Sequence, residues 1–258
     1  MAKRILLLLA HPDDETFGPG GTIAKYAREG NEVHLLAATR GEAGMLGDPP
    51  VTDREHLGEV RSAELEAAAG VLGAAKVHYL GFHDGKLESL PRELLVEGAV
   101  EAVRRVRPHV LAGFGPEGVS RHPDHKVMCE VALAAFDRAG DPGWYPGHFR
   151  DPGLRPWTPL KLYQFELPRE VLSAWGIPLA GVPLAKLTTV IDTSADAETK
   201  LRAFPCHRTQ KKDVERILAR PGFREFIRQE TFILARTRVA GPAFPETDLL
   251  AGIPEDSE

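Results

Sequence analysis

The chain has 258 residues and a mass of 28.2 kDa, and its 43% hydrophobic and 27% charged residues exclude an intrinsically disordered protein. No apolar run approaches the ~20 residues that a membrane-spanning helix needs, so a transmembrane protein is not expected. The formal net charge is −5, and five acids but no base follow Arg238, so residues 1–238 carry no excess positive charge for binding nucleic acid.

The N-terminus combines Lys3 and Arg4 with an apolar run over residues 5–10, a combination that also begins secretory signal peptides. The run ends after six residues at His11, which is too short for a signal peptide, and no small-residue cleavage site follows. We therefore interpret residues 5–10 as a buried first strand, and we expect a cytoplasmic protein.

Short apolar runs alternate with longer helix-like segments over the first 140 residues. Thr52 and Glu55 fit a capping box that would open the second helix, and Gly73 suits its end. The alternation predicts an α/β fold of the Rossmann-like, doubly wound type, with a mainly parallel sheet and helices on both faces. The predicted strands cover 5–10, 32–38, 76–80 and 109–114, and the predicted helices cover 21–29, 54–72, 92–107 and a segment from Pro123 onward.

Residues 140–158 are rich in proline, glycine and aromatic residues, which predicts a long irregular insertion. Such an insertion is either a lid or wall of a pocket, or a variable surface excursion. Further strands are predicted at 161–166, 187–191 and 231–235, and further helices at 195–204 and 211–219. We expect one domain over residues 1–238, followed by a loosely packed acidic tail over 239–258.

Two polar clusters follow predicted strands of this sheet. His11-Pro12-Asp13-Asp14-Glu15 comes directly after the first strand, and His122-Pro123-Asp124-His125 follows the loop after the fourth. In a sheet of order 3-2-1-4 the first and fourth strands are neighbours, and ligand sites form at their carboxyl ends. We therefore expect the two clusters to meet in one crevice, although more than a hundred residues separate them.

These residue types suit a catalytic zinc site, which typically has three protein ligands and a water. His11 and Asp14 together with one distant ligand, either His125 or His122, would supply the three. Asp13 would then act as general base on a water made acidic by the metal. The remaining histidine would stabilise an oxyanion or protonate a leaving amine.

Each cluster also has a purely structural interpretation, because His-Pro-Asp-Asp could form a turn and Asp124 could favour a helix N-terminus. The coincidence of both clusters at strand ends favours a site instead. Residues 18–21 carry no dinucleotide fingerprint, because Ile23 stands where the third glycine is needed. His-Glu-x-x-His and Gly-x-Ser-x-Gly motifs are absent, and Cys129 and Cys206 form neither a disulfide framework nor a Cys-x-x-Cys metal motif.

The AHPDDE and HPDH segments resemble the PIG-L/LmbE-like family of zinc-dependent N-acetylglucosaminyl deacetylases, and the resemblance covers most of residues 4–236. It implies a Rossmann-like fold and homo-oligomers, trimers or hexamers. It implies His11, Asp14 and His125 as ligands of one Zn²⁺ per chain, Asp13 as general base, and His122 as the residue that stabilises developing charge or acts as general acid. Further matching stretches are 39–42, Arg61-x-x-Glu64 with Leu72-Gly73, 79–85, Arg107-Pro108, 190–192, Lys200 and 207–210.

The resemblance also implies that Arg54 and Asp84 contact the sugar, and that His207 matches a family histidine to which no role is assigned. One departure concerns a tyrosine that some members use in catalysis two residues before the HPDH histidine. Ser120 stands at that position, so the tyrosine's role is either absent or filled from the insertion by Tyr145. Alternatively, Arg121 recognises an acidic group of the substrate.

The sequence thus predicts a zinc-dependent hydrolase that removes the acetyl group from an N-acetylated amino sugar, a small-molecule substrate. One alternative is a deacetylase of a bacillithiol- or mycothiol-type thiol pathway, or a thiol-conjugate amidase. Another is a non-catalytic sugar-binding protein, against which the spare base Asp13 counts. Neither nucleic acid nor a membrane is expected as a partner.

Overall fold

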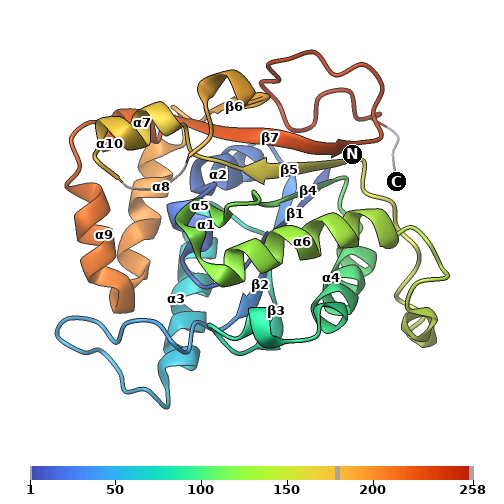
Figure 1. The fold of residues 1–258 in the computed structure, drawn as a ribbon, viewed down its shortest axis with the longest axis horizontal. Helices are drawn as coiled ribbons and strands as arrows, with labels where there is room; N and C mark the ends of the chain where they lie inside the picture. Colours follow the sequence, from blue (N-terminus) through green and yellow to red (C-terminus); the bar gives the residue numbers. More distant parts are fainter. Residues whose placement is uncertain (1, 178–180, 256–258) are drawn as a thin grey trace.

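The computed structural model describes residues 2–177 and 181–255. Its strands are β1 (Arg4–Leu9), β2 (Glu32–Thr39), β3 (Lys76–Phe82), β4 (Val110–Phe114), β5 (Lys161–Phe165), β6 (Thr189–Asp192) and β7 (Gln229–Thr237). They form one sheet in the order β3-β2-β1-β4-β5-β7-β6 (Figure 1). Strands β1 to β5 pair in parallel, whereas β7 is antiparallel to both β5 and β6. The order 3-2-1-4 expected for the first four strands is confirmed.

Strand β1 lies at the centre of the core. Its residues after Arg4 are all buried, and Leu7 is in register with Leu35 on one side and Ala112 on the other. The strand is a continuous apolar run without alternation because helices cover both faces of a parallel sheet. The backbone is therefore rigidly held as far as Leu9, two residues before His11.

Helices cover the sheet on both sides (Figure 1). The helices are α1 (Asp14–Phe17), α2 (Gly20–Arg28), α3 (Leu57–Leu72), α4 (Arg92–Val106), α5 (Gly118–Arg121), α6 (Pro123–Arg138), α7 (Arg169–Ala174), α8 (Ala197–Ala203), α9 (Lys211–Leu218) and α10 (Phe223–Phe226). Short 3₁₀ turns occur at Leu87–Ser89, Pro146–Arg150, Leu184–Lys186, Phe204–Cys206 and Arg208–Gln210. Helices α4 and α6 pack together on one face, and α2, α3 and α8 cover the other. No helix within the described ranges combines the length and apolar character needed to cross a bilayer.

The start of α3 differs from the prediction. The helix begins at Leu57 and not at residue 54, and no side-chain cap forms at its first turn. Asp53 instead accepts a hydrogen bond from the backbone N–H of His56 (2.9 Å), which makes a local turn before the helix. The predicted end is confirmed, because Gly73 adopts a left-handed φ of 80°.

The insertion at residues 140–158 is anchored far from the carboxyl ends of the strands. The buried guanidinium of Arg104 in α4 donates hydrogen bonds to the carbonyl oxygens of Asp141 (2.8 Å) and Trp144 (2.9 Å). The Tyr145 hydroxyl donates to Glu93 on the same helix. None of these residues lines the cavity described below, so a pocket wall at 140–158 and a catalytic Tyr145 are both wrong.

The acidic tail is packed and not loose, as far as residue 255. Glu246 is buried and lies 2.6 Å from the Lys161 ammonium, and the Tyr163 hydroxyl donates to it at 2.7 Å. Leu249 is buried in the main core, and its N–H donates to the Tyr26 hydroxyl. The expectation of a loose tail fails because a buried lysine in β5 requires a carboxylate partner.

Candidate active site

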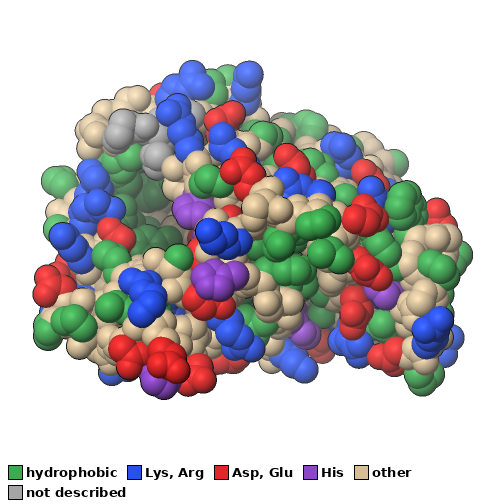
Figure 2. Space-filling view, turned by 60° about the horizontal axis from the view of Figure 1, so that its bottom comes forward, with side chains coloured by type: hydrophobic (Ala, Val, Ile, Leu, Met, Phe, Trp, Pro, Cys, Tyr) green, Lys and Arg blue, Asp and Glu red, His purple; other side chains and the backbone are tan. Residues whose placement is uncertain are grey.

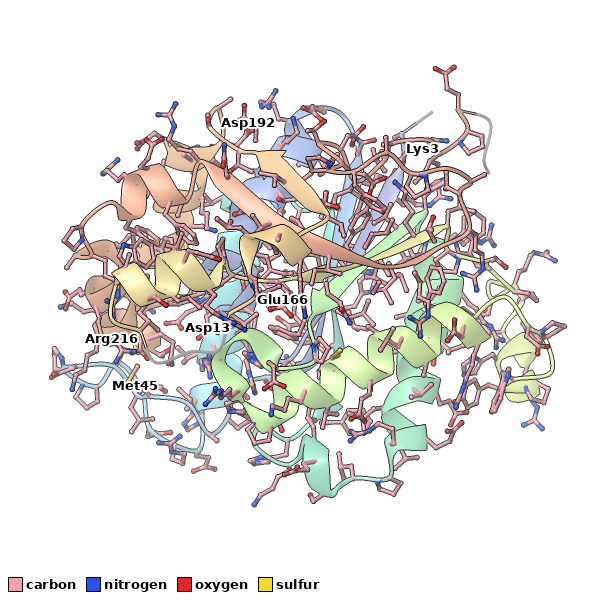
Figure 3. All side chains as sticks on the ribbon, turned by 45° about the horizontal axis from the view of Figure 1, so that its top comes forward. Lys3, Asp13, Met45, Glu166, Asp192 and Arg216 are labelled. Atoms are coloured by element: carbon pink, nitrogen blue, oxygen red, sulfur yellow. The ribbon has the colours of Figure 1, made fainter. Side chains whose placement is uncertain are left out.

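The two polar clusters meet in one cavity of about 710 Å³. Strands β1 and β4 are neighbours, so the residues that follow them converge at the same edge of the sheet. His11, Asp13 and Asp14 line the cavity from one strand end, and His122 and His125 line it from the other. Figure 2 shows a hollow in the molecular surface with hydrophobic side chains on its walls and histidine side chains beside it. In Figure 3, Asp13 and Arg216, which both line the cavity, lie on the same side of the molecule, with Arg216 nearer its edge.

A tight turn between β1 and α1 presents the first cluster. The Asp14 carboxylate accepts hydrogen bonds from the backbone N–H groups of Ala10 (3.0 Å) and His11 (2.7 Å). Asp13 adopts a φ of 113°, a conformation that L residues rarely adopt. The Glu15 carboxylate holds this conformation by accepting the Asp13 N–H at 3.0 Å. A strained non-glycine residue at a strand end is typical of a functional site.

Three candidate ligand atoms face one another at the bottom of the cavity. His11 Nδ1 lies 3.2 Å from His125 Nε2. Asp14 Oδ2 lies 3.7 Å from His11 Nδ1, and the other carboxylate oxygen, Oδ1, lies 3.2 Å from His125 Nε2. Tetrahedral zinc with Zn–N bonds of about 2.0–2.1 Å places its ligand atoms about 3.3 Å apart. The two histidine nitrogens therefore have the spacing of metal ligands, and the Asp14 carboxylate lies beside both of them.

The outward nitrogens of these histidines determine their tautomers. His11 Nε2 lies 2.9 Å from Asp84 and 3.3 Å from Asp124, and His125 Nδ1 lies 3.0 Å from the carbonyl oxygen of Gly118. Each outward nitrogen must carry a proton to bond these acceptors, so in the neutral rings both inward nitrogens are lone pairs. Two lone pairs at 3.2 Å beside a carboxylate repel one another unless a cation lies between them. The residues thus fit a metal ion.

The pKa values in this cluster reflect its excess of carboxylates. Burial lowers the pKa of His11, but hydrogen bonds to Asp124 and Asp84 outweigh it and raise the pKa to about 10. Burial raises the pKa of Asp14, but the neighbouring His125 outweighs it and holds the pKa well below its usual range. Both directions mean that the cluster favours added positive charge.

His122 faces the same space. One ring nitrogen from each of His11, His122 and His125 lies within 4.8 Å of the other two. However, His122 Nδ1 accepts the backbone N–H of Asp124 (3.2 Å) and so caps the start of α6. In the neutral ring Nε2 then carries the proton, which makes His122 a hydrogen-bond donor to a substrate oxygen. The geometry favours His125 over His122 as the third ligand.

Asp13 lies beside the ligand set without joining it. Arg61 from α3 donates to the Asp13 carboxylate at 2.9 Å and to the carbonyl oxygens of Pro12 and Gly41. Burial raises the pKa of Asp13 to about 6, although the Arg61 charge lowers it in part. A half-buried carboxyl with a raised pKa, fixed by one arginine, has the features of a general base.

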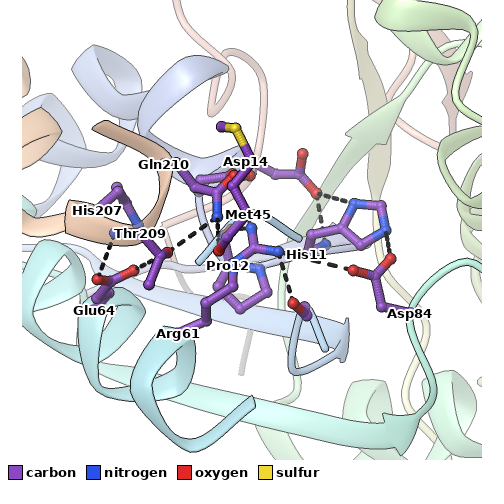
Figure 4. A network of polar contacts seen from close by, with 12 residues as sticks. His11, Pro12, Asp14, Met45, Arg61, Glu64, Asp84, His207, Thr209 and Gln210 are labelled. Carbon is purple, nitrogen blue, oxygen red and sulfur yellow. Dashed lines mark hydrogen bonds and ion pairs between the residues drawn. The ribbon is translucent and has the colours of Figure 1, made fainter. Parts of the chain in front are cut away.

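Several functional contacts come from residues to which the sequence assigned no role. Asp124 joins Asp84 in holding His11, and Glu15 pairs with the buried His207 at 2.7 Å. Figure 4 shows Asp84 and Asp14 on opposite sides of His11, with Arg61 between the β1 turn and the segment of His207. Arg61 and His207 lie in stretches that match the family, and this match was the available signal.

Glu64 holds that segment against α3. Its carboxylate accepts the backbone N–H of Thr209 at 2.9 Å and the Thr209 hydroxyl at 2.6 Å. The neighbouring Gln210 lines the cavity. This pair joins α3 to residues 207–210, two of the stretches that match the family.

Of the three residues predicted to touch the substrate, one lines the cavity and two do not. Asp84 lines the cavity, but its carboxylate is engaged with His11 and with the backbone N–H of Ala43. Arg54 is exposed, lies outside the cavity lining and donates to the carbonyl oxygens of Glu42 and Gly44, so it supports a loop beside the cavity. Arg121 is also exposed and outside the lining. Neither arginine lines the cavity, and their contacts with the substrate stay a prediction.

Comparison with known proteins agrees with the site. The PIG-L family, described as GlcNAc-PI de-N-acetylase, matches residues 6–136. A 1D-myo-inositol 2-acetamido-2-deoxy-alpha-D-glucopyranoside deacetylase of Rhodococcus jostii is 34% identical over 91% of this chain and 92% of its own length. The protein of the same name from Thermobispora bispora is 33% identical over 97% and 99%.

Among solved structures, the N,N'-diacetylchitobiose deacetylase of Pyrococcus horikoshii has a TM-score of 0.69 at 24% identity, over 90% of this chain and 83% of its own. GalB, the 4-carboxy-2-hydroxymuconate hydratase of Pseudomonas putida, has a TM-score of 0.71 at 20% identity, over 93% and 99%. The same fold therefore supports different reactions, and the function must be argued from the site.

Proposed function

Because the chain belongs to the PIG-L family of GlcNAc-PI de-N-acetylases and is an N-deacetylase, an amide hydrolase, we propose that it removes acetyl from an N-acetylglucosaminide at a zinc ion. His11, Asp14 and His125 would hold the ion. The observation that carries the proposal is the close approach of His11 Nδ1 to His125 Nε2, 3.2 Å apart and beside the Asp14 carboxylate. Zinc when bound would polarise the amide carbonyl and make water acidic enough to lose a proton near neutral pH.

The other polar residues would complete the reaction. Asp13 accepts a proton from the attacking water, and the hydrogen bond from Arg61 fixes its carboxylate during the transfer. His122 donates its Nε2–H to the carbonyl oxygen as that oxygen becomes an oxyanion. The carbon–nitrogen bond then breaks, the proton held by Asp13 passes to the leaving amine, and acetate is released.

The hydrogen-bond partners of the two ligating histidines would keep them in place. Asp84 and Asp124 hold His11 by its outward nitrogen, and the carbonyl of Gly118 holds His125. Such outer contacts fix the tautomer of a ligating histidine and raise its basicity.

A second candidate function is supported by the names of the relatives, which are deacetylases of an inositol glucosaminide. On that basis the substrate would be an N-acetylglucosaminyl inositol of a mycothiol-type thiol pathway. A thiol-conjugate amidase would use the same residues and differ only in the walls of the cavity.

The test measures metal content and acetate release together. Wild-type protein purified without added metal or chelator is expected to contain about one zinc per chain, and Asp14→Ala is expected to lose the zinc and the release of acetate. Asp137→Ala, on the exposed side of α6, is the matched control and should keep both. Wild-type protein that binds no metal when zinc is supplied would overturn the proposal.

We further propose that the enzyme acts in the cytoplasm as a trimer or hexamer. Light scattering coupled to size-exclusion chromatography checks the assembly. A monomer that is fully active would contradict the need for self-association.

A further inference from the structure

The cavity continues from the polar site into a region that has no part in the reaction above. We call this region the apolar arm, and its lining residues are Phe17, Phe165, Leu172, Trp175, Ile217 and Phe226. They come from α1, from the end of β5, and from α7, α9 and α10 with the residues next to them. Figure 2 shows hydrophobic side chains on the walls of the hollow.

The apolar arm has a rigid support of its own. Phe204, Val214, Phe223 and Ile227 form a hydrophobic cluster that is distinct from the main core under the sheet. Trp175 packs edge-on against Phe226, with ring centroids 4.8 Å apart. The side chains of the arm are therefore held in place by packing.

Several of its side chains are only half-buried. Phe17, Trp175, Ile217 and Phe226 pack against the second cluster on one side and remain partly exposed on the side of the cavity. Contiguous exposed apolar surface inside a cavity indicates a binding site for an apolar group. A cavity of about 710 Å³ lies within the roughly 300–1,000 Å³ that encloses a drug-sized ligand.

The charged side chains that line the cavity beside this surface have partners of their own. Arg216 pairs with Asp213 at 2.6 Å on α9, and Arg220 donates to the backbone carbonyl of Trp175 at 3.0 Å. The hydroxyl groups of a polar aglycone would lose water against the aromatic side chains without gaining partners from them. The aromatic and aliphatic part of the wall therefore matches an alkyl or aryl group.

We propose that the substrate is an N-acetylglucosaminide with an apolar aglycone, an alkyl or aryl group that occupies the apolar arm. This rests on the proposed function, because a deacetylase removes a small acyl group and the large apolar group must then belong to the aglycone. The arm is continuous with the site at which the amide is cleaved, so one ligand spans both. The specificity-determining residues are Trp175, Phe226 and Ile217.

The first experiment compares kcat/KM for the methyl, octyl and inositol glycosides of N-acetylglucosamine. The octyl glycoside is expected to exceed the other two by roughly tenfold or more, because its chain becomes buried. In Trp175→Ala and Ile217→Ala the ratio of octyl to methyl kcat/KM is expected to fall by about tenfold and threefold, the larger side chain burying the larger area. Leu218→Ala on the exposed side of α9 is the matched control and should keep the wild-type ratio.

A binding measurement separates this inference from the proposed function. Octyl glucoside has no amide, so isothermal titration calorimetry with it reports binding without turnover. Binding in wild type that is lost in Trp175→Ala is expected. Acetate release from the methyl and inositol glycosides with no octyl preference and no octyl glucoside binding would overturn the apolar arm and leave the deacetylase intact.

Two other outcomes would also overturn the inference. No acetate from any glycoside despite octyl glucoside binding would overturn the deacetylase and, with it, the assignment of an aglycone. A preference that follows the length of the N-acyl chain and ignores the aglycone would place the acyl group in the arm and overturn the inference.

Discussion

The polar half of the cavity is held together by hydrogen bonds between strand ends, whereas the apolar arm is held by packing among short helices. In the polar half, His11 has carboxylates on both sides of its ring, which come from α1, from the loop after β3 and from α6. In the apolar arm, Trp175 and Phe226 contact one another and a small separate cluster. The two halves therefore separate the reaction from the choice of substrate, since catalysis needs directional contacts and apolar binding does not.

This difference makes a testable pattern. Substitutions in the polar half should reduce turnover for all substrates alike. Substitutions in the apolar arm should change the order of substrates and leave the reaction in place.

The largest effect is expected for Asp13→Asn, which removes the base and keeps the shape of the side chain. kcat should fall by roughly 10²–10⁴-fold on every glycoside, with bound zinc unchanged. Steady-state kinetics with metal analysis of the same sample checks both. Turnover at the wild-type level would show that another group accepts the proton.

A somewhat smaller effect is expected for His122→Ala, which removes one donor to the oxyanion. kcat should fall by roughly 10²–10³-fold while KM changes little, because the donated hydrogen bond strengthens in the transition state. Zinc content should remain at the wild-type level. Loss of the metal would instead make His122 a ligand and contradict the assignment of His125.

Asp84→Ala tests the hydrogen bonds that hold the outward nitrogens of the ligating histidines. Zinc affinity measured against a competing chelator should fall by about 10–100-fold, because His11 loses the partner at 2.9 Å that fixes its tautomer. Asp84→Asn keeps an acceptor oxygen and should recover part of the loss. Equal affinities in all three proteins would mean that Asp84 serves the substrate alone.

The smallest effect concerns the support of the apolar arm. Phe223→Leu should lower the free energy of unfolding by about 1–2 kcal/mol, as expected when a buried side chain loses volume. Urea unfolding measures this, and the octyl-to-methyl ratio should shrink by about twofold through displacement of Trp175. A fall of kcat on the methyl glycoside as large as that of His122→Ala would show that the two halves are not independent.

Much of the polar half could be predicted from the sequence. Two short motifs at the ends of two buried strands indicated one crevice, because parallel neighbours bring their carboxyl ends together. The resemblance then assigned roles to His11, Asp13 and His125, and the distances among their side chains are compatible with those roles. Arg61 was quoted as a family match without a role, whereas the resemblance assigned Arg54 to the substrate.

The sequence alone thus determined the strand order around β1 and the chemistry at its end, because hydrophobic runs and short motifs are local properties of the chain. Only the tertiary structure decided which arginine reaches Asp13, that the insertion at 140–158 lies away from the cavity, and that the tail packs through Glu246. It also assembled the apolar arm from residues 17 to 226. Contacts between residues so far apart depend on how helices pack, and packing leaves no periodic signal in the sequence.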